Sequence, residues 1–193
     1  MLARAVRHKI KIEVGDMLES MLSVGLSPSL TTALHQLAIY IPTFKGQIAE
    51  GLLKILSEIL MKQPFRHPGT PKRLLSPSHL QMMPAASELP DTSAVVLGLR
   101  TLGTFDFDGH SLLQFVQHCA DNYLHSKEKM IQLEAVKTCS SLLKGTLLGL
   151  GTMNSPTVMA TINKVLAKLL IVGITDQDSD VRSCVMDLSL IHI

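Results

Sequence analysis

The sequence contains no tryptophan, and aromatic side chains make up only 4% of its 193 residues. Because 46% of the residues are nevertheless hydrophobic, Leu, Ile, Val, Met and Ala must fill the core. This composition favours interlocking helices over a β-sandwich or a β-barrel. No segment reads as a strand. We therefore expect an all-α protein.

Long apolar runs and paired cysteines are also missing. No run approaches the roughly 18 apolar residues that span a bilayer, since the most apolar segment, 165–174, is short and contains Lys168. This predicts that the chain has no transmembrane segment. The three cysteines, Cys119, Cys139 and Cys184, show no CxxC spacing and fall on apolar helical stripes. They are interpreted as reduced core thiols of an intracellular protein.

Charge is scarce as well. Charged residues make up 18% of the chain, below the usual share of about a quarter, so much of the surface must be apolar or covered, as in a segment of a longer stack. The formal net charge of +2 is too small to indicate nucleic acid binding. Four basic residues, at positions 4, 7, 9 and 11, precede the first acidic residue. They fit either a basic amphipathic targeting segment or a solvated helix face, which we favour.

What the chain does contain is a repeat of its apolar positions about every 50 residues. When segment 112–135 is shifted onto segment 162–185, apolar positions coincide, so that Leu112 matches Ile162 and Ile131 matches Val181. A period of this size is typical of a solenoid, in which each unit buries its apolar face against its neighbours. The repeat therefore predicts a scaffold and disfavours the competing class, a small self-contained helical enzyme.

Helical spacing of the apolar residues predicts eight helices in four antiparallel pairs. The pairs occupy residues 1–63 and 91–188, and the expected helices include 45–61, 111–124 and 127–143. Gly25 is expected to end the first helix in the left-handed conformation, and Ser27 to cap the second. Gly173 is likewise expected to end the first helix of the fourth pair. Residues 189–193 do not continue the pattern, and we interpret them as an atypical tail produced by truncation or a sequencing artefact.

A proline-rich segment interrupts the second pair. Residues 64–90 hold six of the nine prolines, so no helix can run through them, and we expect a long flexible loop, which solenoids tolerate. Thr70 and Ser76 each precede a proline and fit a proline-directed kinase consensus. Phosphate at either position would lie beside basic residues 66, 72 and 73 and could order the loop.

The sharpest motif is the acidic segment 176–182. Asp176, Asp178 and Asp180 have the spacing of a calcium-binding loop, but Val181 stands where that loop requires glycine. In the alternative that we favour, the segment is the turn between two helices of a pair. The aspartates then cap the second helix, Val181 enters the core, and Arg182 pairs with Asp178. An Asp-rich turn followed by Val-Arg resembles the HEAT repeat.

Other polar residues give no catalytic pattern. His110, His118 and His125 flank one expected helix at spacings that offer no zinc-chelating pair. Asp106 and Asp108 are interpreted as a turn and helix cap. No GxSxG, glycine-rich phosphate loop or Cys–His arrangement occurs. We therefore expect no catalytic residue, no cofactor and no metal site in this chain.

Several stretches resemble the target of rapamycin protein kinases. They include Met21-Leu22-Ser23-Val24-Gly25-Leu26-Ser27-Pro28, Gly109-His110-Ser111-Leu112 and Val172-Gly173-Ile174-Thr175-Asp176. The similarity runs from about Leu2 to Cys184 and includes the proline-rich insert. It implies a fragment of the N-terminal HEAT solenoid of a giant serine/threonine kinase that couples nutrients to growth.

The resemblance also implies partners and a location. HEAT arms of that family shape a dimeric complex and bind companion subunits such as a raptor-like adaptor, so we expect a cytoplasmic segment that meets lysosomal or other endomembranes only through the parent complex. No kinase motif is present, so no catalytic residue carries over. One departure is Gln132, which stands where the 50-residue register places Arg182. An unrelated HEAT scaffold, such as a transport receptor or phosphatase subunit, remains the alternative.

Overall fold

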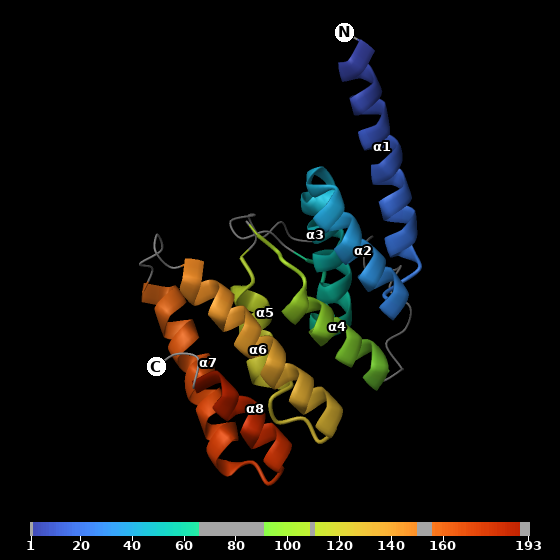
Figure 1. Cartoon of the computed structure of the whole chain (residues 1–193). Helices are drawn as coiled ribbons and strands as arrows, with labels where there is room; N and C mark the ends of the chain where they lie inside the picture. Colours follow the sequence, from blue (N-terminus) through green and yellow to red (C-terminus); the bar gives the residue numbers. More distant parts are fainter. Residues whose placement is uncertain (1, 66–90, 109–110, 150–155, 190–193) are drawn as a thin grey trace, which may run out of the picture.

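The computed structural model describes residues 2–65, 91–108, 111–149 and 156–189, and over these ranges it contains helices and no strand (Figure 1). The helices are α1 (Leu2–Ser23), α2 (Pro28–Tyr40), α3 (Lys45–Leu56), α4 (Thr92–Thr104), α5 (Leu113–Asn122), α6 (Lys129–Gly149), α7 (Pro156–Thr175) and α8 (Ser179–Ser189). A short 3-10 helix, η1 (Pro42–Phe44), precedes α3, and a π-helical turn, η2 (Ser57–Met61), extends it. The prediction of an all-α solenoid is confirmed.

The helices form two layers along an elongated body. In one layer α1 packs against α3, η2 against α5, and α5 against α7; in the other, α4 packs against α6, and α6 against α8. Figure 1 shows α1 leading away from the body at one end and the α7–α8 pair closing the other. The buried apolar side chains form one continuous core, from Leu18 in α1 to Val185 in α8.

Local signals fix the first helix boundaries. Gly25 has a φ of +98°, which glycine adopts without the steric penalty of a Cβ, and it ends α1 as predicted. The side chain of Ser27 accepts a hydrogen bond from the amide of Leu30 at 3.2 Å, and Pro28 opens α2. Asp91 caps α4 in the same way, by accepting from the amide of Ser93 at 3.1 Å.

The π-helical turn anchors α5. Lys62, which follows η2, adopts a left-handed φ of 52°, and the hydroxyl of Ser57 donates to the carbonyl of Gln63 at 2.7 Å. The hydroxyl of Tyr123, at the end of α5, donates to the carbonyl of Leu60 at 2.7 Å. Burial raises the pKa of Tyr123 to about 12, so the phenol stays a donor throughout the physiological range.

The predicted end of α7 at Gly173 was wrong, because α7 continues to Thr175. Gly173 is buried inside the helix, and a Cβ at this position would lie 2.7 Å from Cγ1 of Val185 in α8. The glycine therefore serves close helix packing instead of a turn. Gly103 in α4 also permits close helix packing, because a Cβ there would lie 3.1 Å from Cα of Thr138 in α6.

Two other boundaries differ from the predictions. Helix α6 extends to Gly149, beyond the expected end at 143, and α8 includes Ser189, the first residue of the expected tail. Residues 190–193 lie outside the described part of the chain, as do residues 66–90, which make up nearly all of the expected proline-rich loop.

One described helix, α7, is long and apolar enough to cross a membrane by length and composition, contrary to the expectation that no run approaches such a length. Core helices can have the same length and composition. In α7, Ile162, Val165 and Leu169 are buried in the core, and Lys168 pairs with Asp121 of α5 at 2.6 Å. The absence of a transmembrane segment stays a prediction.

Candidate functional site

The acidic segment 176–182 forms the turn between α7 and α8. Oδ1 of Asp176 accepts a hydrogen bond from the amide of Asp178 at 2.9 Å, and Oδ1 of Asp178 accepts from the amide of Asp180 at 2.9 Å. Each carboxylate thus binds a backbone N–H group two residues ahead, at the positively charged start of α8. Val181 is fully buried. The aspartates therefore order the turn as well as the start of the helix.

The predicted pair between Arg182 and Asp178 does not form. Nη1 of Arg182 donates to the carbonyl of Asp176 at 2.6 Å, and Asp178 instead pairs with Lys129 of α6 at 2.7 Å. Lys129 also lies 2.9 Å from Asp180. The hydrogen bond from Lys129 holds the pKa of Asp178 below its ordinary value. The acidic turn of the fourth pair is therefore bound to the third pair.

Gln132 explains the departure from the repeat register. Its Nε2 donates to the carbonyl of Leu124 at 3.1 Å and to Oδ2 of Asp176 at 2.6 Å. The first contact stabilises the turn between α5 and α6, just as the contact of Arg182 with Asp176 stabilises the turn between α7 and α8. The second contact reaches across to that next turn. An uncharged amide at this position thus replaces the arginine and adds a link between pairs.

A further bridge joins the third and fourth pairs, between α5 and α7. Asp121 of α5 lies 2.6 Å from Nζ of Lys168 and 3.5 Å from Nζ of Lys164, both in α7. The hydrogen bond from Lys168 is the main cause that lowers the pKa of Asp121 below its ordinary value. Sequence reasoning missed this bridge because its members are 47 residues apart.

The interpretation of Asp106 and Asp108 as a helix cap was wrong. The residue at the N-cap of α5 is Leu112, which makes no side-chain cap, and both carboxylates instead approach Nζ of Lys45, at 2.5 Å and 3.0 Å. These hydrogen bonds raise the pKa of Lys45. The two aspartates do form a turn, since the amide of Asp108 donates to Asp106 at 3.2 Å. They close the second pair by joining the start of α3 to the chain after α4.

The described ranges contain no group of three His, Cys, Asp or Glu side chains that could hold a metal ion. At the acidic turn, the ammonium of Lys129 occupies the place where a cation would bind Asp178 and Asp180. His118 faces the ring of Tyr123, 5.9 Å away between centroids. Three other candidates from the sequence, His110, Thr70 and Ser76, lie outside the described residues.

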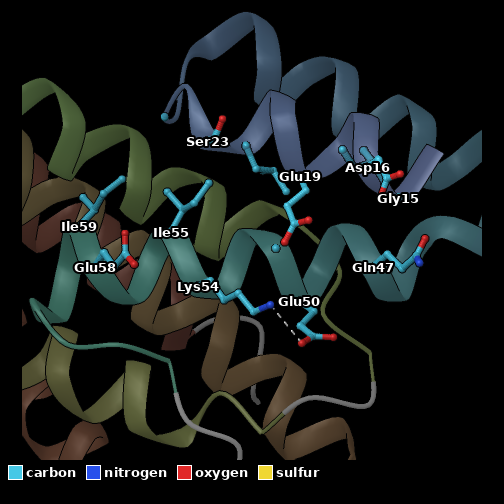
Figure 2. A pocket seen from close by; sticks show the side chains of 14 residues that line it. Gly15, Asp16, Glu19, Ser23, Gln47, Glu50, Lys54, Ile55, Glu58 and Ile59 are labelled. Carbon is cyan, nitrogen blue, oxygen red and sulfur yellow. Dashed lines mark ion pairs between the residues drawn. The ribbon is translucent and has the colours of Figure 1, made fainter. Parts of the chain in front are cut away.

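A groove of about 960 Å³ lies between α1 and α3–η2 (Figure 2). Leu18 and Leu22 line it from α1, and Ile55 and Ile59 from α3–η2. Carboxylates of Asp16, Glu19, Glu50 and Glu58 stand around these apolar side chains, with one cation, Lys54, paired to Glu50 at 3.4 Å. The sequence pattern gave no sign of this groove, because its two walls come from different pairs.

These features define a class of protein, an α-solenoid whose successive helix pairs are joined by side chains at their turns. No family model matches the chain. Over 94% of its length it is 41% identical to the serine/threonine-protein kinase mTor of Drosophila melanogaster. It is 32% identical to tor1 of Schizosaccharomyces pombe over 97% of its length, and 28% identical to TOR of Arabidopsis thaliana over 95%.

The chain is a homologue of one segment of the target of rapamycin serine/threonine kinases, and the resemblance seen in the sequence is thereby confirmed. It spans only 7% to 8% of the length of these three relatives.

Proposed function

We propose that the chain is a non-catalytic HEAT-repeat scaffold segment of a target of rapamycin-type kinase. The observation that carries this proposal is the end-to-end similarity of 94% to 97% of the chain to a segment of 7% to 8% of proteins named as these kinases. The names of the relatives favour this parent over a transport receptor or a phosphatase subunit.

The contacts between pairs support a scaffold role. Lys129, Gln132 and Asp121 of the third pair all bind side chains of the fourth, as repeats do when each is stabilised by its neighbour. Helix α7 also exposes Leu170, Ile171 and Ile174, by 55%, 53% and 71%. Further repeats of the parent chain are the proposed cover for this apolar surface.

In the parent kinase, the segment supports assembly of the complex and binding of companion subunits such as a raptor-like adaptor, in nutrient and growth signalling. The complex is cytoplasmic and reaches lysosomal or other endomembranes as a peripheral assembly. The proline-rich segment 64–90, with Thr70 and Ser76, is its proposed phosphorylation site, which phosphopeptide mapping of the native protein tests.

Affinity purification of the native protein followed by peptide mass spectrometry tests the proposal. Peptides of this chain are expected from a polypeptide more than ten times as long, given the share of the relatives that the chain spans, together with the adaptor. The purified 193-residue chain is expected to transfer no phosphate from labelled ATP above the level of a heat-denatured sample. Recovery of the sequence as a separate 21.1 kDa protein, or phosphoryl transfer by the purified chain, contradicts the proposal.

A further inference from the structure

The groove between α1 and α3–η2 lies where the first pair meets the second, apart from the polar contacts that join the third pair to the fourth. Its residues on α3 and η2 include Glu50, Lys54, Ile55, Glu58 and Ile59, at intervals of three and four that place them along one side of the helix. The core-facing side of the same helix carries the fully buried Ile48, Leu52 and Leu56. The groove therefore lies along a different face of α3 from these three residues, and it reaches the edge of the core at Leu18.

The floor of the groove has the form that receives a helix. Leu22 on α1 and Ile55 and Ile59 on the facing helix are half-buried and line the furrow from its two sides. Leu18 on α1 also lines it but is almost completely buried. Helices pack by placing the side-chain ridge of one into the groove of another. The lining extends over Gly15–Ser23 and Gln47–Ile59, roughly 13 Å and 20 Å of helix axis, which matches about three turns of a bound helix.

One close contact between the two walls involves Gly51. Gly51 lines the groove, and a Cβ there would lie 2.3 Å from Cδ1 of Leu22. The glycine thus lets α1 approach α3 at this point, so that their larger side chains form the walls on either side. Figure 2 shows Glu19 extending from α1 and Ile55 and Ile59 standing on the facing helix.

The charged residues around the groove favour a positively charged partner. Four carboxylates (Asp16, Glu19, Glu50 and Glu58) face one ammonium (Lys54), and that ammonium is already paired with Glu50. An anionic ligand such as nucleic acid is therefore repelled. A partner with positive charges on both sides of an apolar stripe complements both the rim and the floor.

We propose that this groove binds an amphipathic helix of a partner protein whose apolar stripe, at i, i+3, i+4 and i+7, is flanked by Lys or Arg. This deepens the proposed scaffold function, because it states the chemistry of one partner. It does not depend on which kinase complex holds the chain. The tests of the two proposals are separate, since those of the scaffold role read phosphoryl transfer and copurification.

Fluorescence anisotropy on the full 193-residue chain tests the inference. The probe is a labelled peptide of about 14 residues, roughly 21 Å as a helix, with Leu at the four stripe positions and Lys or Arg beside them. Saturable binding is expected, weakening as salt screens the charges. A scrambled peptide of the same composition is expected to bind about tenfold more weakly, because its apolar residues no longer share one face.

Two variants with matched controls locate the binding surface. Glu19→Lys reverses a rim charge and is expected to weaken binding about tenfold, whereas Glu128→Lys, an identical charge change at an exposed position outside the groove, is expected to leave it within about twofold. Ile55→Gln removes an apolar wall and is expected to weaken binding similarly. Its control is Ile171→Gln at an exposed site on α7. Far-UV circular dichroism checks that all four variants keep their helical content.

Several results overturn the inference. These are no binding to the original chain, equal binding of the scrambled peptide, or binding unchanged in both groove variants. Self-association of the chain that is lost in Glu19→Lys, without binding of the peptide, would identify a second copy of this chain as the occupant and would also overturn the inference. Tighter binding by a peptide of residues 64–90 than by the probe would assign the groove to the chain's own proline-rich segment and would overturn it too.

Discussion

Replacing Gly173 by alanine isolates the close packing between α7 and α8. Two effects oppose each other in this variant. Alanine is favoured over glycine inside a helix by up to about 1 kcal/mol. Its Cβ, however, would lie 2.7 Å from Cγ1 and 3.0 Å from Cβ of Val185. Ordinary contact requires a shift of roughly 0.7 Å, and the branched side chain of Val185 cannot rotate away without moving another methyl group inward.

Overpacking of a buried site costs about 1–3 kcal/mol, and the helix preference of alanine offsets up to about 1 kcal/mol of this, so we expect a net loss of up to about 2 kcal/mol in the free energy of unfolding. For a chain of this size the melting temperature then falls by roughly 2–4 °C for each kcal/mol lost. Urea unfolding followed by circular dichroism measures the loss directly, after coincident transitions from a second probe have established two-state behaviour.

Two companion variants make the result interpretable. Gly46→Ala, in the first turn of α3, meets no atom within 4 Å and is expected to raise stability by about 0.5 kcal/mol. In a Val185→Ala background, which removes the obstructing methyl groups, Gly173→Ala is expected to be neutral or stabilising. A stabilising effect of Gly173→Ala in the original chain would show that α8 moves freely, and would refute the packing argument.

Three further outcomes follow from single contacts. Tyr123→Phe removes the only side-chain donor described at the carbonyl of Leu60 and is expected to cost about 1 kcal/mol in urea unfolding; no change would mean that water replaces the phenol. Thr138→Val removes a buried hydroxyl that lies 2.8 Å from the carbonyl of Leu99, and a similar loss is expected, with unchanged circular dichroism as the control. The pKa of Asp178 is lowered by Lys129, so its contribution is present above the ordinary value near 3.8 and is lost as pH falls below it. The urea midpoint of the original chain should therefore drop on acidification, and it should drop less in Lys129→Gln. Equal drops would show that the Lys129–Asp178 contact does not cause the pH dependence.

Elements whose signals are local could be predicted from the sequence. Gly25, Ser27 and Asp91 act on backbone groups within three residues of themselves, so the residue types alone indicate where those helices end or begin. The spacing of apolar residues likewise predicts the helices, and the expected packing of α5 on α6 and of α7 on α8 is found. The expected first pair is not closely packed, because α1 packs against α3. The identity of the family was also accessible, because whole stretches of sequence carried it.

Gly173 shows where such reasoning stops. Like Gly25 it follows an apolar helical run, but it lies inside α7 and serves a contact with a residue in another helix. Only the aspartates at 176 and 178 signalled that the turn comes later.

Contacts between pairs were beyond sequence reasoning for the same physical reason. The partners of Lys45 and Lys129 are chosen by the distance between helices that are about 50 to 60 residues apart in the chain. The acidic groove is also a product of that packing, since neither α1 nor α3 alone carries its two walls.

The placement of the polar bridges has a mechanical consequence. Lys129, Gln132 and Asp121 lie near the edge of the stack at which α5 turns into α6, and their partners include Asp176 and Asp178 at the neighbouring turn. These bonds are directional and short, and they add to the apolar packing between the pairs at this one edge of the stack. We therefore expect that bending the solenoid rotates the α7–α8 pair about this edge, which changes the curvature of the stack more than its length.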